Sequence, residues 1–260
     1  MQIGYLDGLK FALDTGRVTL DDLYFQDEFP LYAGKVMNLG RARKNDKVCS
    51  RVPYMATRFT GSIVISNKGF VKADLIPGNM TDKSFQEFCL NSQESNNVCR
   101  NLGGLPLFSL LPKGSFIVWD RLGRSGRSKN PTRMHFNPAV HSALNRGGIQ
   151  VVMLPPKGHM LNPAELCINA IQQYVARWRP REPEVNDHGQ LVVGPQKFEE
   201  CKEALSDALS SLPRKAYEGF YKYRADGRHF HQFNARSKGF MNISGERAEV
   251  AVISHWPQKL

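Results

Sequence analysis

The stretch from Ile149 to Glu165, with the sequence IQVVMLPPKGHMLNPAE, contains the pattern that decides the fold. Its first six residues are mostly apolar and β-branched, which predicts a buried strand over residues 149–154. Two prolines follow that strand. Asn162 and Pro163 then form a typical helix start, with the asparagine at the N-cap and the proline at the first helical position. The chain is therefore expected to pass from a buried strand through a short loop into a helix.

Residues 162–178 form the clearest predicted helix. Apolar side chains recur along it at helical spacing, which predicts one buried stripe made of Cys167, Ala170, Ile171, Tyr174, Val175 and Trp178. Glu165 lies in the first turn and has two possible roles. It can complete a capping box with Asn162, or it can present its carboxylate to a functional site, and the helix pattern leaves both open.

A second strand, residues 115–120, ends abruptly in an acid. The run Ser115-Phe116-Ile117-Val118-Trp119 is apolar after its first residue, and Asp120 follows it directly. This pattern is typical of a buried strand that delivers a polar group to the edge of a sheet. A short helix over residues 137–144, closed by Gly147 and Gly148, connects it to the strand over residues 149–154.

The first half of the chain predicts three antiparallel strands and a helix. Residues 23–29 form a strand that ends near Pro30, which places Asp27 at the strand's edge, where it is either a turn residue or a site residue. Residues 59–66 and 69–76 form a hairpin joined at Asn67-Lys68-Gly69. A helix over residues 79–90 follows, with Thr81 or Asp82 as its N-cap.

This order of elements predicts the fold class. Three meandering strands followed by alternating strands and helices give an α/β fold, a ribonuclease-H-like mixed five-stranded sheet flanked by helices. We expect this core to span residues 1–178, with a linker at residues 179–195 and a C-terminal helical extension at residues 196–260. In that extension, residues 197–212 predict an amphipathic helix. Residues 215–224 mix aromatic and basic side chains, which favours a packed helix over a base-stacking surface.

Composition indicates a polyanionic partner. The 260 residues carry 35 Lys and Arg against 24 Asp and Glu, a formal net charge of +11, so nucleic acid is expected first and an anionic membrane second. Apolar runs are strand-sized, far below the roughly 18 residues of a membrane helix, which excludes a transmembrane function. Without a secretion signal or a cysteine framework, we expect an intracellular, reducing compartment: the nucleus in a eukaryote, the cytoplasm in a bacterium.

Two segments hold much of the positive charge. Residues 30–60 carry seven basic side chains against Asp46, and residues 113–147 carry seven against Asp120. Such runs are either solvated loops or phosphate contacts, and their position beside candidate catalytic acids favours the contacts.

Three stretches together resemble the catalytic domain of mariner-type and related insertion-sequence transposases. The first is residues 154–165, where a strand, two prolines and a short loop lead into Leu-Asn-Pro-x-Glu. The second is residues 24–28, similar to that family's first Asp-Glu strand. The third is residues 117–120 followed by His135 and the helix to Leu144, similar to its second Asp, its His and the helix behind. The resemblance spans about residues 20–178.

The resemblance implies a DDE catalytic domain that cleaves DNA and transfers strands. Asp27, Asp120 and Glu165 would be the catalytic residues and would hold two Mg²⁺ or Mn²⁺ ions, since hard cations prefer carboxylate oxygens and an ion pair can stabilise both the entering and the leaving oxygen. His135 would contact a phosphate or orient Asp120. The nucleic-acid contacts would come from Lys35, Arg41, Arg43, Lys44, Arg121, Arg124, Arg127, Lys129, Arg133, His135 and Lys157.

The sequence also departs from the family's pattern. A basic Gly/Ser insertion over residues 121–129 lengthens the interval from Asp120 to Glu165, and Lys157 and Met160 replace an aromatic and an acid of the proline loop. Only 26 residues precede Asp27, so we expect no helix-turn-helix reader, and hence a homodimer or a partner subunit that supplies sequence recognition.

Two other functions stay open. One is a domesticated, inactive nucleic-acid-binding or scaffold subunit. The other is a structure-selective resolvase, which often needs a fourth acid. Glu28 is the near candidate for that acid, but it should alternate to the other side of its strand.

Overall fold

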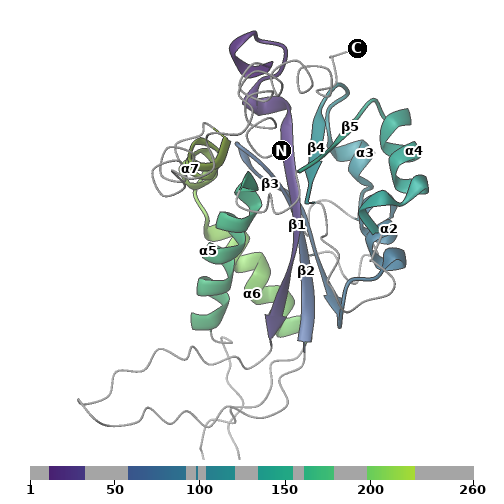
Figure 1. The fold of residues 1–260 in the computed structure, drawn as a ribbon. Helices are drawn as coiled ribbons and strands as arrows, with labels where there is room; N and C mark the ends of the chain where they lie inside the picture. Colours follow the sequence, from purple (N-terminus) through teal and green to yellow (C-terminus); the bar gives the residue numbers. More distant parts are fainter. Residues whose placement is uncertain are drawn as a thin grey trace, which may run out of the picture.

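The computed structural model describes residues 12–32, 58–91, 98, 104–120, 134–154, 161–178 and 198–225. These residues form a five-stranded sheet in the order β3-β2-β1-β4-β5 (Figure 1). Its strands are β1 (Leu23–Tyr32), β2 (Arg58–Ser66), β3 (Gly69–Pro77), β4 (Phe116–Trp119) and β5 (Gln150–Met153). The first three pair antiparallel, and β4 and β5 add to β1 in parallel. The mixed sheet matches the predicted layout.

Helices cover both faces of the sheet (Figure 1). One face carries α5 (Pro163–Arg177), α6 (Phe198–Ser211) and α7 (Arg214–Ala225), and the other carries α2 (Asp82–Leu90), α3 (Leu107–Leu110) and α4 (Pro138–Arg146). Two short 3₁₀ turns, η1 (Leu20–Asp22) and η2 (Met134–Phe136), precede β1 and α4. Each face has its own hydrophobic cluster, because alternate residues of each strand point to opposite sides.

The predicted helix starts are confirmed. Thr81 caps α2 by accepting a hydrogen bond from Ser84 N, Asn137 caps α4, and Asn162 caps α5 by accepting from Ala164 N. In α4 and α5 a proline occupies the first turn, where no backbone N–H is needed. The capping of α5 therefore uses the Asn162 side chain, and Glu165 is placed in the first turn of that helix.

The strand that carries Asp27 is longer than predicted. β1 runs through Pro30 to Tyr32, so Asp27 lies in its middle and not at its edge. Pairing with β2 continues to Tyr32↔Arg58, whereas pairing with β4 ends at Phe25↔Val118. Among the described residues no strand pairs with this side of β1 beyond Phe25, in line with the tendency of proline to occupy an unpaired strand edge.

Two predicted burial patterns are wrong in part. Tyr174, placed in the buried stripe of α5, is 38% exposed, while Cys167, Ile171, Val175 and Trp178 are buried as expected. Strand β5 is half-buried because it forms an edge of the sheet. Cys89, Cys167 and Cys201 are buried, and within the described residues they form no disulfide. Within the described ranges no helix is both long and apolar enough to span a bilayer.

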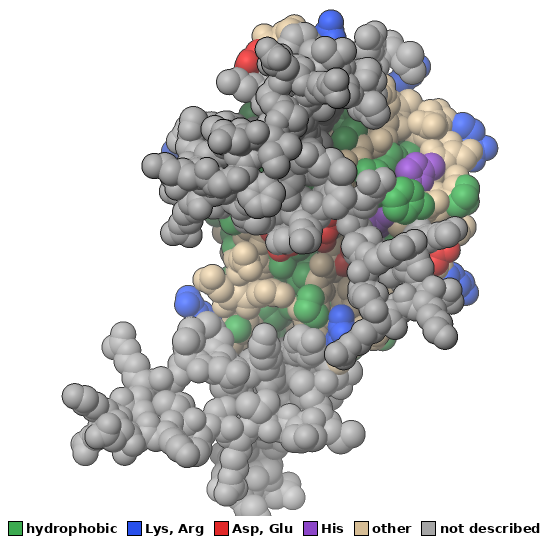
Figure 2. Space-filling view, in the orientation of Figure 1, with side chains coloured by type: hydrophobic (Ala, Val, Ile, Leu, Met, Phe, Trp, Pro, Cys, Tyr) green, Lys and Arg blue, Asp and Glu red, His purple; other side chains and the backbone are tan. Residues whose placement is uncertain are grey.

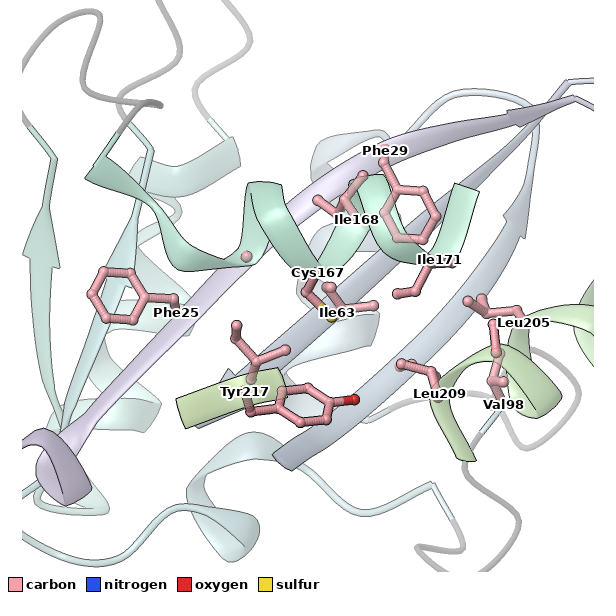
Figure 3. Packing of buried hydrophobic residues seen from close by; sticks show 14 of the residues in the cluster. Phe25, Phe29, Ile63, Val98, Cys167, Ile168, Ile171, Leu205, Leu209 and Tyr217 are labelled. Atoms are coloured by element: carbon pink, nitrogen blue, oxygen red, sulfur yellow. The ribbon is translucent and has the colours of Figure 1, made fainter. Parts of the chain in front are cut away.

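Helices α6 and α7 pack into the main hydrophobic cluster. Figure 3 shows Leu205, Leu209 and Tyr217 packed with residues of α5 and of the strands. The Tyr221 hydroxyl is bonded to the backbone oxygens of Leu23 (3.0 Å) and Ile65 (2.9 Å), which ties α7 to β1 and β2. Buried residues of α6 and α7 thus share one hydrophobic cluster with α5 and with strands β1 to β4. The predicted linker at residues 179–195 lies outside the described residues.

Asp74 of β3 makes stability depend on pH. It is 2% exposed, and burial raises its pKa to about 6 although Lys72 and Lys202 lower it. Because the pKa of Asp74 is higher in the folded state, folding favours its protonated form. Asp74 therefore adds to the free energy of unfolding at low pH, and this stabilisation is lost as pH rises through about 6. From about pH 4 to pH 7, the free energy of unfolding should fall by roughly 2 kcal/mol relative to Asp74→Asn. Urea unfolding of both proteins across this range measures the difference, and parallel curves would contradict the prediction.

Candidate active site

The sheet brings Asp27 and Asp120 to the same place. The parallel register of β1 and β4 pairs Leu23 with Phe116 and Phe25 with Val118. Extending it by two residues places Asp27 level with Asp120, which directly follows β4. By strand alternation both side chains share the face of Phe25 and Val118, which is the face covered by α5.

The first turn of α5 lies against Asp27. The Asn162 amide donates to Asp27 Oδ2 (3.0 Å) and to the backbone oxygen of Gln26 (3.3 Å), while its Oδ1 caps Ala164 N. One asparagine thus caps the helix and fixes it to the carboxylate. The same turn carries Glu165, the third predicted acid. The sequence identified Asn162 as a cap but gave no sign of its bond to Asp27, since that bond joins residues 135 positions apart.

The four carboxylates around β1 interact electrostatically. Burial raises the pKa of Asp27 well above its usual range, and the charges of Glu28, Glu165 and Asp120 raise it further. The Glu28 N–H, which donates to Asp27 Oδ1 at 2.8 Å, offsets only part of this. Figure 2 shows acidic side chains near the middle of this face, over the sheet. The site therefore concentrates negative charge that a divalent cation would neutralise.

The donor set suits a hard cation, although the described side chains are not gathered at ligand distance. Asp27, Asp120 and Glu165 offer only carboxylate oxygens, the ligands that Mg²⁺ and Mn²⁺ prefer. Within the described residues, no three His, Cys, Asp or Glu side chains are close enough to hold one metal ion. The chemistry of the donors and the repulsion that Asp27 experiences from the neighbouring carboxylates thus fit a divalent cation.

Glu28 lies on the opposite face of the sheet, as strand alternation predicts. Its carboxylate accepts from Gln26 Nε2 (2.6 Å) and contacts His135 Nε2 (3.0 Å), and its side chain is 11% exposed. Glu28 is therefore separated from Asp27, Asp120 and Glu165, and the structure does not place it as the fourth acid that a resolvase often needs.

His135 is buried and does not offer a phosphate contact. It is 1% exposed, and its Nδ1 lies 2.7 Å from the backbone oxygen of Asp120. Burial lowers its pKa, but the hydrogen bond and charge of Glu28 and the contact with Asp120 outweigh burial, so the pKa is raised overall. Of its two predicted roles, the structure therefore favours orienting Asp120, because both ring nitrogens are already engaged within the protein.

The remaining predicted nucleic-acid contacts lie outside the described residues. They are Lys35, Arg41, Arg43, Lys44, Arg121, Arg124, Arg127, Lys129, Arg133 and Lys157. Three of the described ends of these segments lie at the acids' own elements: Tyr32 ends β1, Asp120 directly follows β4, and Leu161 precedes the cap of α5. These ten contacts stay predictions.

Comparison with known proteins gives likeness in structure only. No family model matches the chain, and no curated protein matches it. A pre-cleavage Mos1 transpososome is similar with a TM-score of 0.58 and 11% identity, over 91% of this chain and 63% of that one. The catalytic domain of Mos1 mariner transposase is similar with a TM-score of 0.51 and 12% identity, over 86% and 89%. The same domain with Raltegravir and Mn gives 0.52 and 11%, over 86% and 90%.

These matches establish the fold. The chain has the ribonuclease-H-like fold of a mariner transposase catalytic domain, which confirms the predicted fold class and the resemblance. It covers about three fifths of the longer Mos1 chains, and nearly all of the isolated catalytic domain.

Proposed function

We propose that this chain, which has the fold of a mariner transposase catalytic domain, is a metal-dependent DNA endonuclease and strand transferase. Asp27, Asp120 and Glu165 are its catalytic residues. The observation that carries the proposal is the meeting of the three acids: the register of β1 and β4 places Asp27 level with Asp120, and the bond from Asn162 to Asp27 holds the first turn of α5, which carries Glu165, against the same face of the sheet. Three acids separated by 93 and 45 positions in the sequence act on one another there, which a purely structural role for each would not require.

The same three carboxylates would hold two Mg²⁺ or Mn²⁺ ions. Such ions polarise the scissile phosphate and stabilise the entering and leaving oxygens of an in-line displacement. The chain's own residues keep the ligands in place: Asn162 holds the Asp27 carboxylate against the first turn of α5, and His135 holds the backbone at Asp120. The Mos1 catalytic domain was solved with Mn and with Mg, which supports the choice of ions.

DNA is the proposed substrate and partner. The net charge of +11 favours a polyanion, and the structural neighbours include a Mos1 paired-end complex with the left transposon end. We further propose a homodimer or a partner subunit that supplies sequence recognition, in the nucleus or in a bacterial cytoplasm.

The basic segment after Asp120 should make DNA binding salt-dependent. Each phosphate contact made by a basic side chain adds about 0.9 to the slope of log affinity against log salt for duplex DNA. Replacing Arg121, Arg124 and Arg127 together by alanine should therefore lower the slope by up to about 3, with weaker binding to every sequence. Fluorescence anisotropy across salt concentrations measures it. Lys68→Ala is the control, since Lys68 already pairs with Asp21 at 2.6 Å. If the wild type, the triple variant and Lys68→Ala all have the same slope, the basic segment after Asp120 is a solvated loop and does not contact phosphates.

The function itself is tested by nicking of supercoiled plasmid. The full chain should convert it to open circles in Mg²⁺ or Mn²⁺, and EDTA should stop the reaction. Absence of nicking at every metal concentration, with DNA binding intact, would overturn the enzyme assignment.

That outcome would favour the second candidate, an inactive nucleic-acid-binding or scaffold subunit derived from a transposase. One observation favours it: the described ligand-type side chains do not gather at metal-binding distance. The two candidates differ in manganese binding, which the enzyme requires and the scaffold does not.

A further inference from the structure

A buried polar network lies on the sheet face opposite the acids. It links Ser62 of β2, Gln26 and Glu28 of β1, and His135 of η2. Gln26 Nε2 donates to Glu28 Oε1 (2.6 Å) and to Ser62 Oγ (3.1 Å), and Glu28 Oε1 lies 3.0 Å from His135 Nε2. Gln26 and Ser62 are fully buried. The network ends at the Asp120 backbone, 2.7 Å from His135 Nδ1.

The partners of His135 define where its protons are. The Asp120 backbone oxygen can only accept, so Nδ1 carries a hydrogen and donates to it. On the other side, Nε2 faces the Glu28 carboxylate, and this contact is attractive only if a proton lies between the two. The ring therefore bridges a fixed acid and the peptide of Asp120, and rotation of the ring would break both contacts.

Packing holds the ring in that orientation. His135 is stacked on Trp119 with a centroid distance of 5.7 Å and packs against Phe85 at 4.9 Å. His141 Nε2 lies 2.8 Å from the His135 backbone oxygen and donates to it, which fixes η2 to α4. On the strand side, Leu154 N donates to the Trp119 oxygen at 2.8 Å. The peptides on both sides of Asp120 are thus anchored, one by β5 and one by His135.

We propose that Glu28 and His135 are a positioning pair for the proposed metal site. They act through the Asp120 backbone, from the face opposite its carboxylate, and neither contacts DNA or metal. The inference rests on the proposed function and names residues within it. Burying two ionisable side chains in contact is costly, and apolar residues of similar size would often stabilise a fold as well or better. We therefore attribute the burial of Glu28 and His135 to the orientation that they give to Asp120, and not to a gain in the stability of the fold.

The test measures manganese binding, by electron paramagnetic resonance of free Mn²⁺, as well as plasmid nicking, on the full chain. Glu28→Ala and His135→Phe remove the pair, and Glu28→Gln keeps the shape and one hydrogen bond to the ring. Lys72→Met is the matched control. Lys72 is equally buried on the same face of the sheet. Its ammonium group donates to the backbone oxygens of Phe88 (2.6 Å) and Leu105 (2.7 Å), so replacing it also destabilises the packing of helices on this face. Asp120→Asn is measured beside them.

Glu28→Ala and His135→Phe should bind manganese about 10- to 100-fold more weakly, the range found when a partner of a metal ligand is lost. Nicking should recover in part at high Mn²⁺, Glu28→Gln should bind manganese much more tightly than Glu28→Ala, and Lys72→Met should lower the melting temperature without changing manganese affinity. If Asp120→Asn weakens binding while Glu28→Ala and His135→Phe behave like Lys72→Met, the positioning pair is wrong and the function stands. If Asp120→Asn also binds manganese like the wild type, the proposed function itself fails.

Discussion

Asp120→Asn should reduce metal-dependent nicking by roughly 10³-fold or more. An ion held at the reacting phosphate supplies several kcal/mol of charge stabilisation, and each 1.36 kcal/mol is a tenfold change in rate. Asparagine has the shape of aspartate but lacks the charge that holds the ion. Rates of plasmid nicking at saturating Mn²⁺ measure the loss. Asp27→Asn and Glu165→Gln should have losses of similar size, because the three carboxylates act as one set.

A stability measurement separates this effect from unfolding. Burial raises the pKa of Asp27 most, and the charges of Glu28, Glu165 and Asp120 raise it further, which means that the metal-free protein contains repelling carboxylates. Asp120→Asn removes part of that repulsion, so its melting temperature without metal should equal or exceed that of the wild type. The control for activity is Asp74→Asn, which changes a buried aspartate on β3 and should nick normally. Nicking by Asp120→Asn at the wild-type rate would remove Asp120 from the catalytic set.

Removing α6 and α7 should prevent folding. A chain that ends at residue 195 lacks seven buried side chains of the main core, namely Cys201, Ala204, Leu205, Ala208, Leu209, Tyr217 and Tyr221. Truncating a single buried leucine to alanine costs about 2–5 kcal/mol, and a domain has only about 5–15 kcal/mol of stability in total. The shortened chain should therefore show no cooperative thermal transition by circular dichroism.

Two point variants set the scale for that experiment. Tyr221→Phe removes the hydroxyl bonded to the oxygens of Leu23 and Ile65 and should cost about 1–3 kcal/mol. Lys215→Ala changes an exposed side chain of α7 and should stay within about 0.5 kcal/mol of the wild type. A chain ending at residue 195 that melts cooperatively at the wild-type temperature would instead make residues 196–260 a separate extension, as the sequence suggested.

Local chemistry made most of the fold predictable. Turns and helix starts depend on contacts between near neighbours, so the residue types at these positions predict them. Examples are the hairpin at Asn67-Lys68-Gly69 and the N-caps Thr81, Asn137 and Asn162. Local pattern marks the three acids as polar residues within or next to an apolar strand or at a capped helix start, but it left the role of each open, and their identification as one set came from the resemblance to the transposase family. The sequence by itself therefore determined the order of the elements and the residue types available to the site.

Only the tertiary structure decided how those residues are used. Asp27 lies in mid-strand because β1 continues to pair with β2 as far as Tyr32, and no local pattern encodes how far a pairing with another strand extends. The bond from Asn162 to Asp27 spans 135 positions, and the contact between Glu28 and His135 spans 107. Helices α6 and α7 have amphipathic patterns that predict an apolar surface beneath them, but not which one. Which side chains contact each other depends on packing between segments far apart in the chain. The sequence could therefore identify the acids as candidates, whereas only the folded protein shows that Asn162 holds Asp27 and that His135 holds the backbone at Asp120.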